Sequence, residues 1–249
     1  VWGLIDNFTA DVSTTDTLSQ LASRQNIIQQ LVQTALSVGL DGINVDFESL
    51  SEDEGPHFLE FLRELSIECH KNNLVVSVDN PVPEDFTSHY DRKEQGLVVD
   101  YVIIMGYDEH YVGSDAGSVA SLPWVEQGVQ DTIAEVTPER TILAIPFYTR
   151  LWKTTGGAVT SEAIGMDEAQ NVLSTNGVEA VWDGSVGQNY ATFEQDNSTY
   201  QIWLEDAQSI AEKVKLIQKY NLAGVAQWKL GFENSSIWQT ISDNLQAAS

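Results

Sequence analysis

The chain has 249 residues, of which 42% are hydrophobic, so it can bury the core of one large α/β domain or of two small ones. Its formal net charge of −25, from 12 Lys and Arg against 37 Asp and Glu, repels phosphate backbones and anionic lipids, which makes nucleic acid and membrane surfaces poor partners. The single cysteine, Cys69, excludes a disulfide within the chain.

Apolar runs bounded by turn residues predict six parallel strands, because the runs are hydrophobic on both faces. The runs are Val1–Phe8, Gly42–Phe47, Leu74–Val78, Tyr101–Gly106, Thr141–Tyr148 and Gly224–Leu230. Stretches with a period near 3.6 residues predict helices at Asn26–Leu40, Phe58–Cys69, Trp124–Val136 and Ala207–Lys219. This alternation predicts an α/β fold with a parallel sheet and outer helices.

Residues 151–205 interrupt that alternation. The stretch is too long for a βα loop of roughly 2–6 residues, and it contains a helical pattern at Ser161–Ser174 followed by aromatic, Gly- and Asn-rich segments. We therefore predict a small α+β insertion at 151–205, with the main domain formed by 1–150 and 206–249. Its aromatic residues form either a glycan-stacking wall or the core of the insertion: Trp152, Trp182, Tyr190 and Trp203.

Three polar residues share one face of the second predicted strand. Alternate side chains of a strand point the same way, so Asn44, Asp46 and Glu48 lie together, roughly 6–7 Å apart in succession. Polar groups on the inner face of an apolar strand are costly unless they have partners or a function. Acidic residues at the carboxyl end of a parallel strand favour an active site. The alternative is a strand that runs out into a solvated acidic turn at Ser51–Glu54.

The segment Asp41–Glu48, with sequence DGINVDFE, resembles the DGxDxDxE signature of glycoside hydrolase family 18, with Asn44 in place of the middle aspartate. Met105–Asp108 is similar to the MxYD element of that family. Pro146–Arg150 is similar to its PxYGR-like element, and Gly224–Trp228 is similar to its last strand with a floor tryptophan.

Within that family, the segments Ile145–Trp152 and Trp228–Glu233 most resemble the bacterial, spore-cortex-lytic and cell-wall-associated branch. The resemblance implies a (β/α)8 TIM barrel, no cofactor, and an extracellular or cell-envelope location. It also implies cleavage of β-1,4 linkages next to N-acetylglucosamine, in peptidoglycan or a chitin-like glycan. The alternatives are a catalytically inactive glycan-binding module on the same fold, and a generic α/β scaffold with an acidic strand end.

The resemblance also implies roles for the strand's residues, in a substrate-assisted retaining mechanism. Glu48 is expected to protonate the glycosidic oxygen, and the 2-acetamido group of the substrate to act as nucleophile. Asp46 is expected to hold the acetamido N–H and to tune Glu48 through a shared proton or like-charge coupling. Asn44 is expected to hydrogen-bond Asp46, and Asp41 to fix the entry of the strand.

Residues of the later segments are expected to contact the sugar. Tyr107 would donate to the acetamido oxygen, Asp108 would join the oxygen network of the sugar, and Trp228 would stack under its ring. Met105, Tyr148 and Arg150 are further expected contacts of the substrate or of these groups. Taken singly, each aromatic residue is as well explained by core packing, and Arg150 by a surface ion pair.

Only six of the eight strands of such a barrel are recognisable. In the order of the family, the strand before Glu48 is the fourth and the strand before Trp228 is the eighth, so the resemblance predicts that this chain lacks the first two βα units. Val1–Asn7 lacks the basic region of a signal peptide and starts within a strand, which predicts a mature or trimmed piece of a longer protein. An open parallel edge at Val1–Phe8 predicts self-association by dimerisation or domain swapping.

Other site chemistries have little support. His57, His70, His89 and His110 have no metal-ligand spacing, so we predict no metal site. Phosphate-binding and serine-nucleophile motifs are absent from the sequence. Asp79 and Asn80 follow the third predicted strand and are a second expected contribution to the cleft, because strand ends of one barrel face converge.

Overall fold

The computed structural model describes residues 1–8 and 13–246, which pack into two compact units. The first unit contains residues 1–8, 13–105 and 131–142, and the second contains 106–130 and 143–246. None of the helices in the described residues is long and apolar enough to cross a bilayer.

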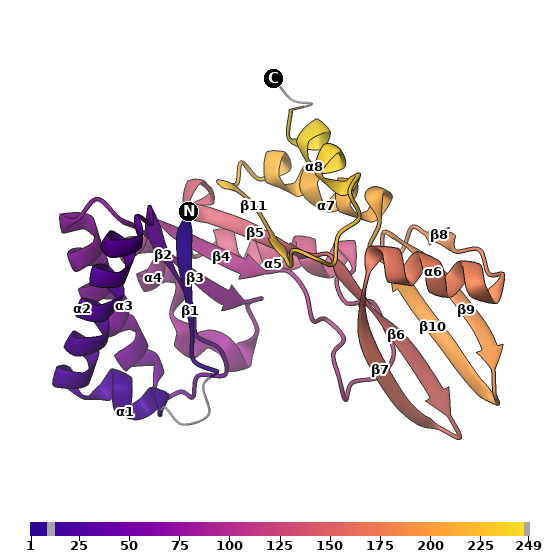
Figure 1. Cartoon of the computed structure of the whole chain (residues 1–249), viewed down its shortest axis with the longest axis horizontal. Coiled ribbons are helices and arrows are strands. Elements are labelled where there is room, and N and C mark those ends of the chain that lie inside the picture. The colour runs from indigo at the N-terminus through magenta and orange to yellow at the C-terminus, as the bar shows by residue number, and fades with distance from the viewer. Residues whose placement is uncertain (9–12, 247–249) are drawn as a thin grey trace. The chain divides into compact units, whose positions relative to one another are not determined.

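The first unit is built on four parallel strands, β1 (Trp2–Asp6), β2 (Gly42–Asp46), β3 (Val75–Pro81) and β4 (Tyr101–Met105). Its helices are α1 (Thr14–Ser19), α2 (Leu21–Val38), α3 (Gly55–Lys71), the 3-10 helix η1 (Asp85–Tyr90) and α4 (Arg92–Val98). Figure 1 shows α2 and α3 running alongside these strands. The apolar stripe of α3 is fully buried and consists of Phe58, Phe61, Leu62 and Leu65.

One six-stranded sheet runs in the order β1-β2-β3-β4-β5-β11, where β5 is Thr141–Pro146 and β11 is Gly224–Trp228. This confirms the six strands predicted from the apolar runs. Within the described residues the sheet has no seventh or eighth strand, so β1 is an edge strand. The side chain of Leu4 on β1 is 52% exposed.

The second unit contains a separate antiparallel sheet of order β7-β6-β10-β9-β8 (Figure 1). The strands are β6 (Tyr148–Thr155), β7 (Ala158–Gly165), β8 (Val181–Asp183), β9 (Gln188–Gln195) and β10 (Ser198–Leu204). The helices are α5 (Leu122–Ile133, shared with the first unit), α6 (Met166–Asn176), α7 (Ala207–Lys219) and α8 (Ile237–Gln246). Helix α6 packs Ala169 and Leu173 against Ile164, Ala191 and Ile202 of the sheet.

The predicted helix Ser161–Ser174 begins too early. Residues up to Gly165 belong to β7, which pairs with β6 over its whole length, and the helix begins only at Met166. Gly165 is extended, and Asp167 with Glu168 occupies the first turn of α6, where carboxylates interact favourably with the helix dipole. The cross-strand pairing with β6 overrides the local helical pattern.

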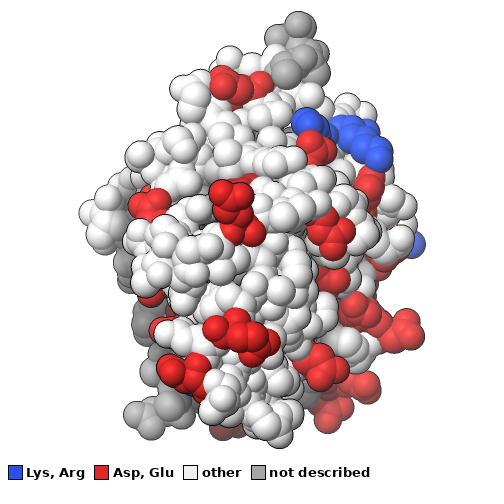
Figure 2. All heavy atoms as spheres, turned by 90° about the vertical axis from the view of Figure 1, so that its right-hand side faces the viewer, with Lys and Arg blue, Asp and Glu red and all other residues white. Residues whose placement is uncertain are grey.

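Acidic side chains are spread over the surface. On the face drawn in Figure 2 they are scattered between uncharged residues and do not form one patch, and the few basic side chains lie near one corner. Acidic side chains distributed in this way on this face keep it well solvated.

Candidate active site

Strand β2 ends at Asp46, and the chain that continues it carries Glu48 two residues later. Phe47 stands between Asp46 and Glu48, and its ring stacks on Phe58 and Phe61 of α3 with centroid distances of 5.7 Å each. Consecutive side chains of an extended chain point to opposite sides. The packing of Phe47 therefore directs Asp46 to the other side of the sheet.

Three aspartates lie level with one another on adjacent strands. Asp46 is in register with Asp6 of β1. Val45 pairs with Val78 of β3, so one step further along the two strands Asp46 lies opposite Asp79. Neighbouring strands are about 4.8 Å apart, so the three carboxylates form a closely spaced row.

Burial and like charge act together on Asp46. Its side chain is almost completely buried at 5% exposure, and burial followed by the charge of Asp6 raises its pKa. Within the described residues its Oδ1 atom is buried and has no hydrogen-bond donor. A carboxylate in this setting favours the protonated form, or a ligand that supplies an N–H donor.

Asn44 connects this row to β3. Its Nδ2 atom donates to Ser77 Oγ and to Asp79 Oδ1, both at 3.0 Å. The prediction that Asn44 hydrogen-bonds Asp46 is therefore corrected. Asn44 is in direct register with Ser77 on the neighbouring strand, whereas Asp46 lies two residues further along the same strand, roughly 6–7 Å away.

Asp79 has the most strongly shifted pKa of the row. Burial raises its pKa to about 7, with the charges of Asp46 and Glu48 adding to the shift and the hydrogen bond from Asn44 opposing it. The expectation that Asp79 contributes to this strand end agrees with its position. Asn80, in contrast, is fully buried and donates to Gln95 Oε1 at 2.6 Å on α4.

Asn7 fixes the main chain of Glu48. Its Nδ2 donates to the carbonyl oxygen of Glu48 at 2.9 Å, and its Oδ1 accepts from the backbone N–H of Glu48 at 3.0 Å. This pairing replaces the ladder bonds that β1 and β2 no longer make beyond Asp6 and Asp46. The sequence interpretation missed Asn7, although a polar residue at the carboxyl end of the first strand was the available signal.

Two predicted residues of the first unit lie at other levels of the sheet. Asp41 precedes β2, is exposed, and forms an ion pair with the amino group of Val1. Five strand steps separate it from Asp46, or roughly 16 Å, so the structure does not bring Asp41 to Glu48. Met105 is the last residue of β4, partly buried and level with Pro81 of β3.

The second unit brings Tyr107, Asp108 and Tyr148 together. The hydroxyl of Tyr148 donates to Asp108 Oδ1 at 2.5 Å, and the rings of Tyr107 and Tyr148 meet edge to face at 6.1 Å. Burial and then the charge of Asp108 raise the pKa of Tyr148, which keeps its hydroxyl protonated. Asp108 adopts a left-handed backbone with φ of 65°, which places it at a sharp turn after β4.

Trp228 ends β11 with 42% of its surface exposed. The ammonium group of Lys229 lies 5.9 Å from the centroid of the Trp228 ring and 5.2 Å from that of Phe232. Arg150 lies on β6, where its guanidinium donates to Ser161 Oγ at 3.0 Å. Trp152 is 1% exposed and donates to the carbonyl of Gly117, so it is a core residue and not a stacking wall.

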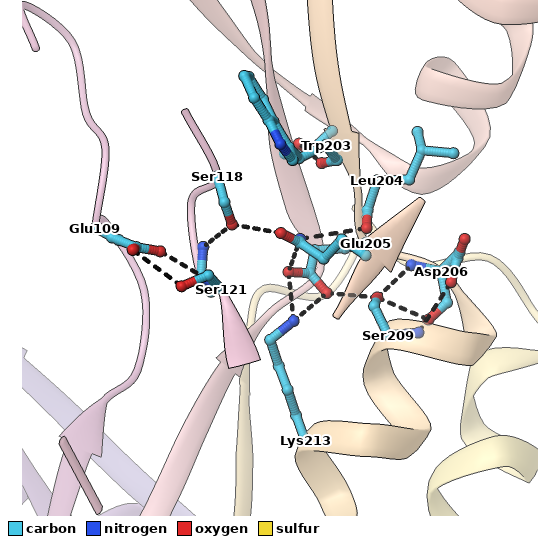
Figure 3. Close-up of polar contacts among 12 residues, drawn as sticks. Glu109, Ser118, Ser121, Trp203, Leu204, Glu205, Asp206, Ser209 and Lys213 are labelled. Atoms are coloured by element: carbon cyan, nitrogen blue, oxygen red, sulfur yellow. Dashed lines mark hydrogen bonds and ion pairs between the residues drawn. The ribbon is translucent and has the colours of Figure 1, made fainter. Parts of the chain in front are cut away.

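A buried polar network ties the loop that follows β4 to the antiparallel sheet and to α7 (Figure 3). Lys213 of α7 donates to both carboxylate oxygens of Glu205, at 2.8 and 3.0 Å. Gln188 of β9 donates to Glu205 Oε1 at 2.8 Å and accepts from the hydroxyl of Ser118. Ser118 belongs to the loop that also carries Tyr107 and Asp108, so the network fixes that loop within the second unit.

Histidines and acidic groups form no metal site among the described residues. His110 contacts the carbonyl of Ser118 at 2.8 Å, and His89 contacts that of Leu50 at 2.7 Å. His70 pairs with Asp100 on the surface. These contacts place the three histidines in structural roles.

Known proteins resemble this chain over most of its length. The uncharacterized glycosylase YvbX of Bacillus subtilis is 24% identical over 96% of this chain and 73% of its own length. The cortical fragment-lytic enzyme of the same species is 24% identical over 88% of this chain, which spans only 53% of that relative. A crystal structure of a chitinase from Chromobacterium violaceum has a TM-score of 0.91 at 24% identity, covering 98% of this chain and 80% of the chitinase.

A structure of the chitinase-like agglutinin of Robinia pseudoacacia also superimposes, with a TM-score of 0.81 at 20% identity, covering 98% of this chain and 81% of the agglutinin. These likenesses show a TIM-barrel-like α/β fold. Residues 7–233 match the sequence family described as glycosyl hydrolases family 18, which includes β2 and its carboxylates as well as β11. The chain therefore belongs to family 18 of the glycosyl hydrolases.

Proposed function

We propose that this chain hydrolyses β-1,4 linkages next to N-acetylglucosamine by substrate-assisted retaining catalysis. The arrangement of Asp46 and Glu48 supports the proposal most directly. Asp46 ends β2 with a buried side chain whose Oδ1 lacks a donor, and Asn7 holds the main chain of Glu48 two residues further on. A fixed carboxyl next to a second, desolvated carboxyl is a suitable setting for a general acid.

In this mechanism Glu48 protonates the glycosidic oxygen. The acetamido oxygen of the substrate then attacks the anomeric carbon, so no protein carboxylate forms a bond to the sugar. The unpaired Oδ1 of Asp46 accepts a hydrogen bond from the acetamido N–H. This bond orients the acetamido oxygen for attack on the anomeric carbon and gives the buried Oδ1 a donor. Water finally opens the oxazolinium ring, and Glu48 takes back a proton.

The aromatic residues of the second unit supply the remaining contacts in this proposal. Tyr107 donates to the acetamido oxygen, and Tyr148 holds Asp108 in place for the hydroxyl groups of the sugar. The exposed Trp228 offers a flat apolar face for the CH groups of a sugar ring. Met105 and Arg150 are supporting residues, since Met105 is partly buried and Arg150 is already bound by Ser161.

We propose peptidoglycan of the bacterial cell envelope as the substrate, with a chitin-like glycan as the second choice. Two curated relatives are named a sporulation-specific glycosylase and a cortical fragment-lytic enzyme. Incubation of the protein with both polymers, followed by mass analysis of the products, tests this choice. Release of products from chitin alone would contradict it.

The assignment of the acid is tested with a chromogenic N-acetylglucosamine oligomer. Glu48→Gln is nearly isosteric and removes the proton donor, so we expect kcat to fall by about 10²–10⁴-fold. Glu52→Gln is the matched control, because Glu52 is an exposed acid four positions later. Equal rates for wild type and Glu48→Gln would refute the assignment.

A glycan-binding module without catalysis is the second candidate function. The superposition on a chitinase-like agglutinin and the exposure of Trp228 favour it. Isothermal titration with chitin oligomers separates the two functions, because a lectin binds the oligomer and leaves it intact. Turnover by wild type that Glu48→Gln abolishes would exclude this second function.

We also propose that a second copy of the chain covers the edge strand β1. No strand pairs with the outer edge of β1 in the described residues, and Leu4 of β1 is 52% exposed. Light scattering during size-exclusion chromatography should show a dimer that Leu4→Lys weakens. A monodisperse monomer at every concentration tested would refute this proposal.

A further inference from the structure

The signature on β2 has an amide where the family pattern has a carboxylate. Asn44 occupies that position and carries no charge. The neighbouring strand β3 places a carboxylate, Asp79, against that amide at 3.0 Å. Asp79 also lies level with Asp46, one strand away.

We propose that Asp79 is a positioning residue. It supplies from β3 the carboxylate that the family pattern has at position 44, where this chain has the amide of Asn44. Through this carboxylate it keeps a proton on the Asp46–Glu48 pair at neutral pH. The inference rests on the proposed hydrolase function. Asp79 itself touches neither the glycosidic oxygen nor the acetamido group in this proposal. It acts through Asp46.

The hydrogen bond from Asn44 to Asp79 makes the amide at position 44 and the carboxylate at position 79 complementary. An amide at position 44 donates to Asp79 Oδ1 and fixes that oxygen, while Ser77 holds the same amide from the other side. A carboxylate at position 44 would instead face Asp79 with like charge in a desolvated place. The geometry therefore accommodates one carboxylate across positions 44 and 79.

The groups that face Asp79 explain its effect on the catalytic pair. Asp46 and Glu48 on β2 carry the nearest like charges, and Asp6 on β1 acts on Asp46 in turn. Strand β4 presents the uncharged Ile103 at this level. Tyr90 of η1 interacts with both Asp46 and Glu48, and Arg92 interacts with Tyr90.

No described cation forms an ion pair with Asp79. The guanidinium of Arg92, the buried cation near this end of β3, is bound to the carbonyls of Pro81 and Thr87. The pKa of Asp79 is raised to about 7 by burial and by these like charges. Carboxyls coupled this closely lose their protons as a group, so the charge at position 79 sets the pH at which Glu48 can still donate.

Three variants test the complementarity: Asp79→Asn, Asn44→Asp and the double variant carrying both. Asp79→Asn removes a like charge, so the alkaline limb of the pH profile of kcat should move to lower pH by about one unit. Asn44→Asp should move the limb to higher pH. The double variant, which returns the carboxylate to β2, should restore the limb to within about 0.3 unit of wild type.

Asp85→Asn is the control, since Asp85 is an exposed acid six positions further along. Its profile should coincide with that of wild type. Coincident profiles for Asp79→Asn and wild type would overturn the inference. So would a double variant that behaves like Asp79→Asn alone.

A titration that needs no turnover separates this inference from the proposed function. Carbon-13 NMR of protein labelled at the aspartate carboxyls should show one group titrating near pH 7, and this signal should vanish in Asp79→Asn while a second aspartate, Asp46, shifts its midpoint downward. Coupled titrations in a protein that cleaves no glycan would leave the coupling intact and refute only the hydrolase. Unchanged titration of the other aspartates in an active enzyme would refute the coupling.

Discussion

Replacing Lys213 by Met breaks the buried ion pair at the centre of the network in Figure 3. The side chains of Lys213 and Glu205 are 0% and 1% exposed, so neither charge is screened by solvent. Met matches the length of the Lys stem and leaves little cavity. The substitution therefore tests the charge of Lys213 and not its volume.

The expected loss in the free energy of unfolding depends on which hydrogen bonds Glu205 keeps. It loses two charge-assisted hydrogen bonds from Lys213 and retains those from Gln188 and Ser209, each at 2.8 Å. Removing one partner of a buried pair costs about 3–5 kcal/mol. Because two neutral donors remain, we expect a loss of about 3 kcal/mol in the free energy of unfolding at pH 7.

The loss should depend on pH with a definite sign. Burial already raises the pKa of Glu205 above its unfolded value of 4.5, and without Lys213 the folded pKa rises further. The folded variant then holds a proton that the unfolded chain releases. Its stability falls as the pH rises above about 4.5, by at most about 1.4 kcal/mol per pH unit. The difference from wild type should be smaller at pH 5 than at pH 8.

Urea unfolding followed by circular dichroism at pH 5, 7 and 8 measures this difference. Lys215→Met is the matched control, because Lys215 lies on the same helix in an exposed pair with Glu212 and should change the free energy by about 0.5 kcal/mol or less. Adding Glu205→Gln to Lys213→Met should remove the pH dependence. A loss no larger than that of the control, or one that is the same at pH 5 and pH 8, would refute the reasoning.

The remaining predictions concern the candidate active site. Asn7→Ala deletes both hydrogen bonds to the main chain of Glu48 and should lower kcat by about 10–100-fold with little change in KM, measured on the chromogenic oligomer; a normal kcat would contradict the role of Asn7. Trp228→Ala should raise KM and leave the pH profile unchanged, since it removes only a stacking face; an unchanged KM would argue against stacking. Asp79→Asn should stabilise the fold by on the order of 1–2 kcal/mol at pH 8 and have no effect at pH 4, because between pH 4 and about 7 folded wild type keeps the proton of Asp79 while the unfolded chain releases it, which lowers the stability of wild type; equal melting curves at pH 8 would contradict this sign.

The main sheet shows which features can be predicted from the pattern of apolar residues along the sequence. All six strands of the main sheet were predicted, because a strand buried on both faces is an unbroken apolar run that is visible locally. The carboxylates at 46 and 48 followed from the alternation of side chains along one strand, and the direction of Asp46 agrees with the packing of Phe47. The partner of Asn44 did not follow, since it depends on the register between two strands.

The second unit shows where local patterns fail. The helix predicted from Ser161 begins at Met166, because β7 gains its hydrogen bonds from β6 and those bonds are made in space, not along the sequence. The sequence left Trp152 open as a stacking residue or a core residue, and only the structure shows it buried with its indole N–H bound to the carbonyl of Gly117. The pair of Glu205 and Lys213 lies eight positions apart, yet nothing local indicates that both are buried.

The sequence by itself determined the α/β class, the positions of the six main strands along the chain, the family signature and the carboxylates of Asp46 and Glu48. Each of these follows from periodicity or from short motifs, which depend on neighbours along the chain. The tertiary structure alone decided the clamp of Asn7 on Glu48, the bond between Asn44 and Asp79, and the row of aspartates across three strands. Those contacts join residues more than 30 positions apart, and only the packed sheet sets their register, burial and charge coupling.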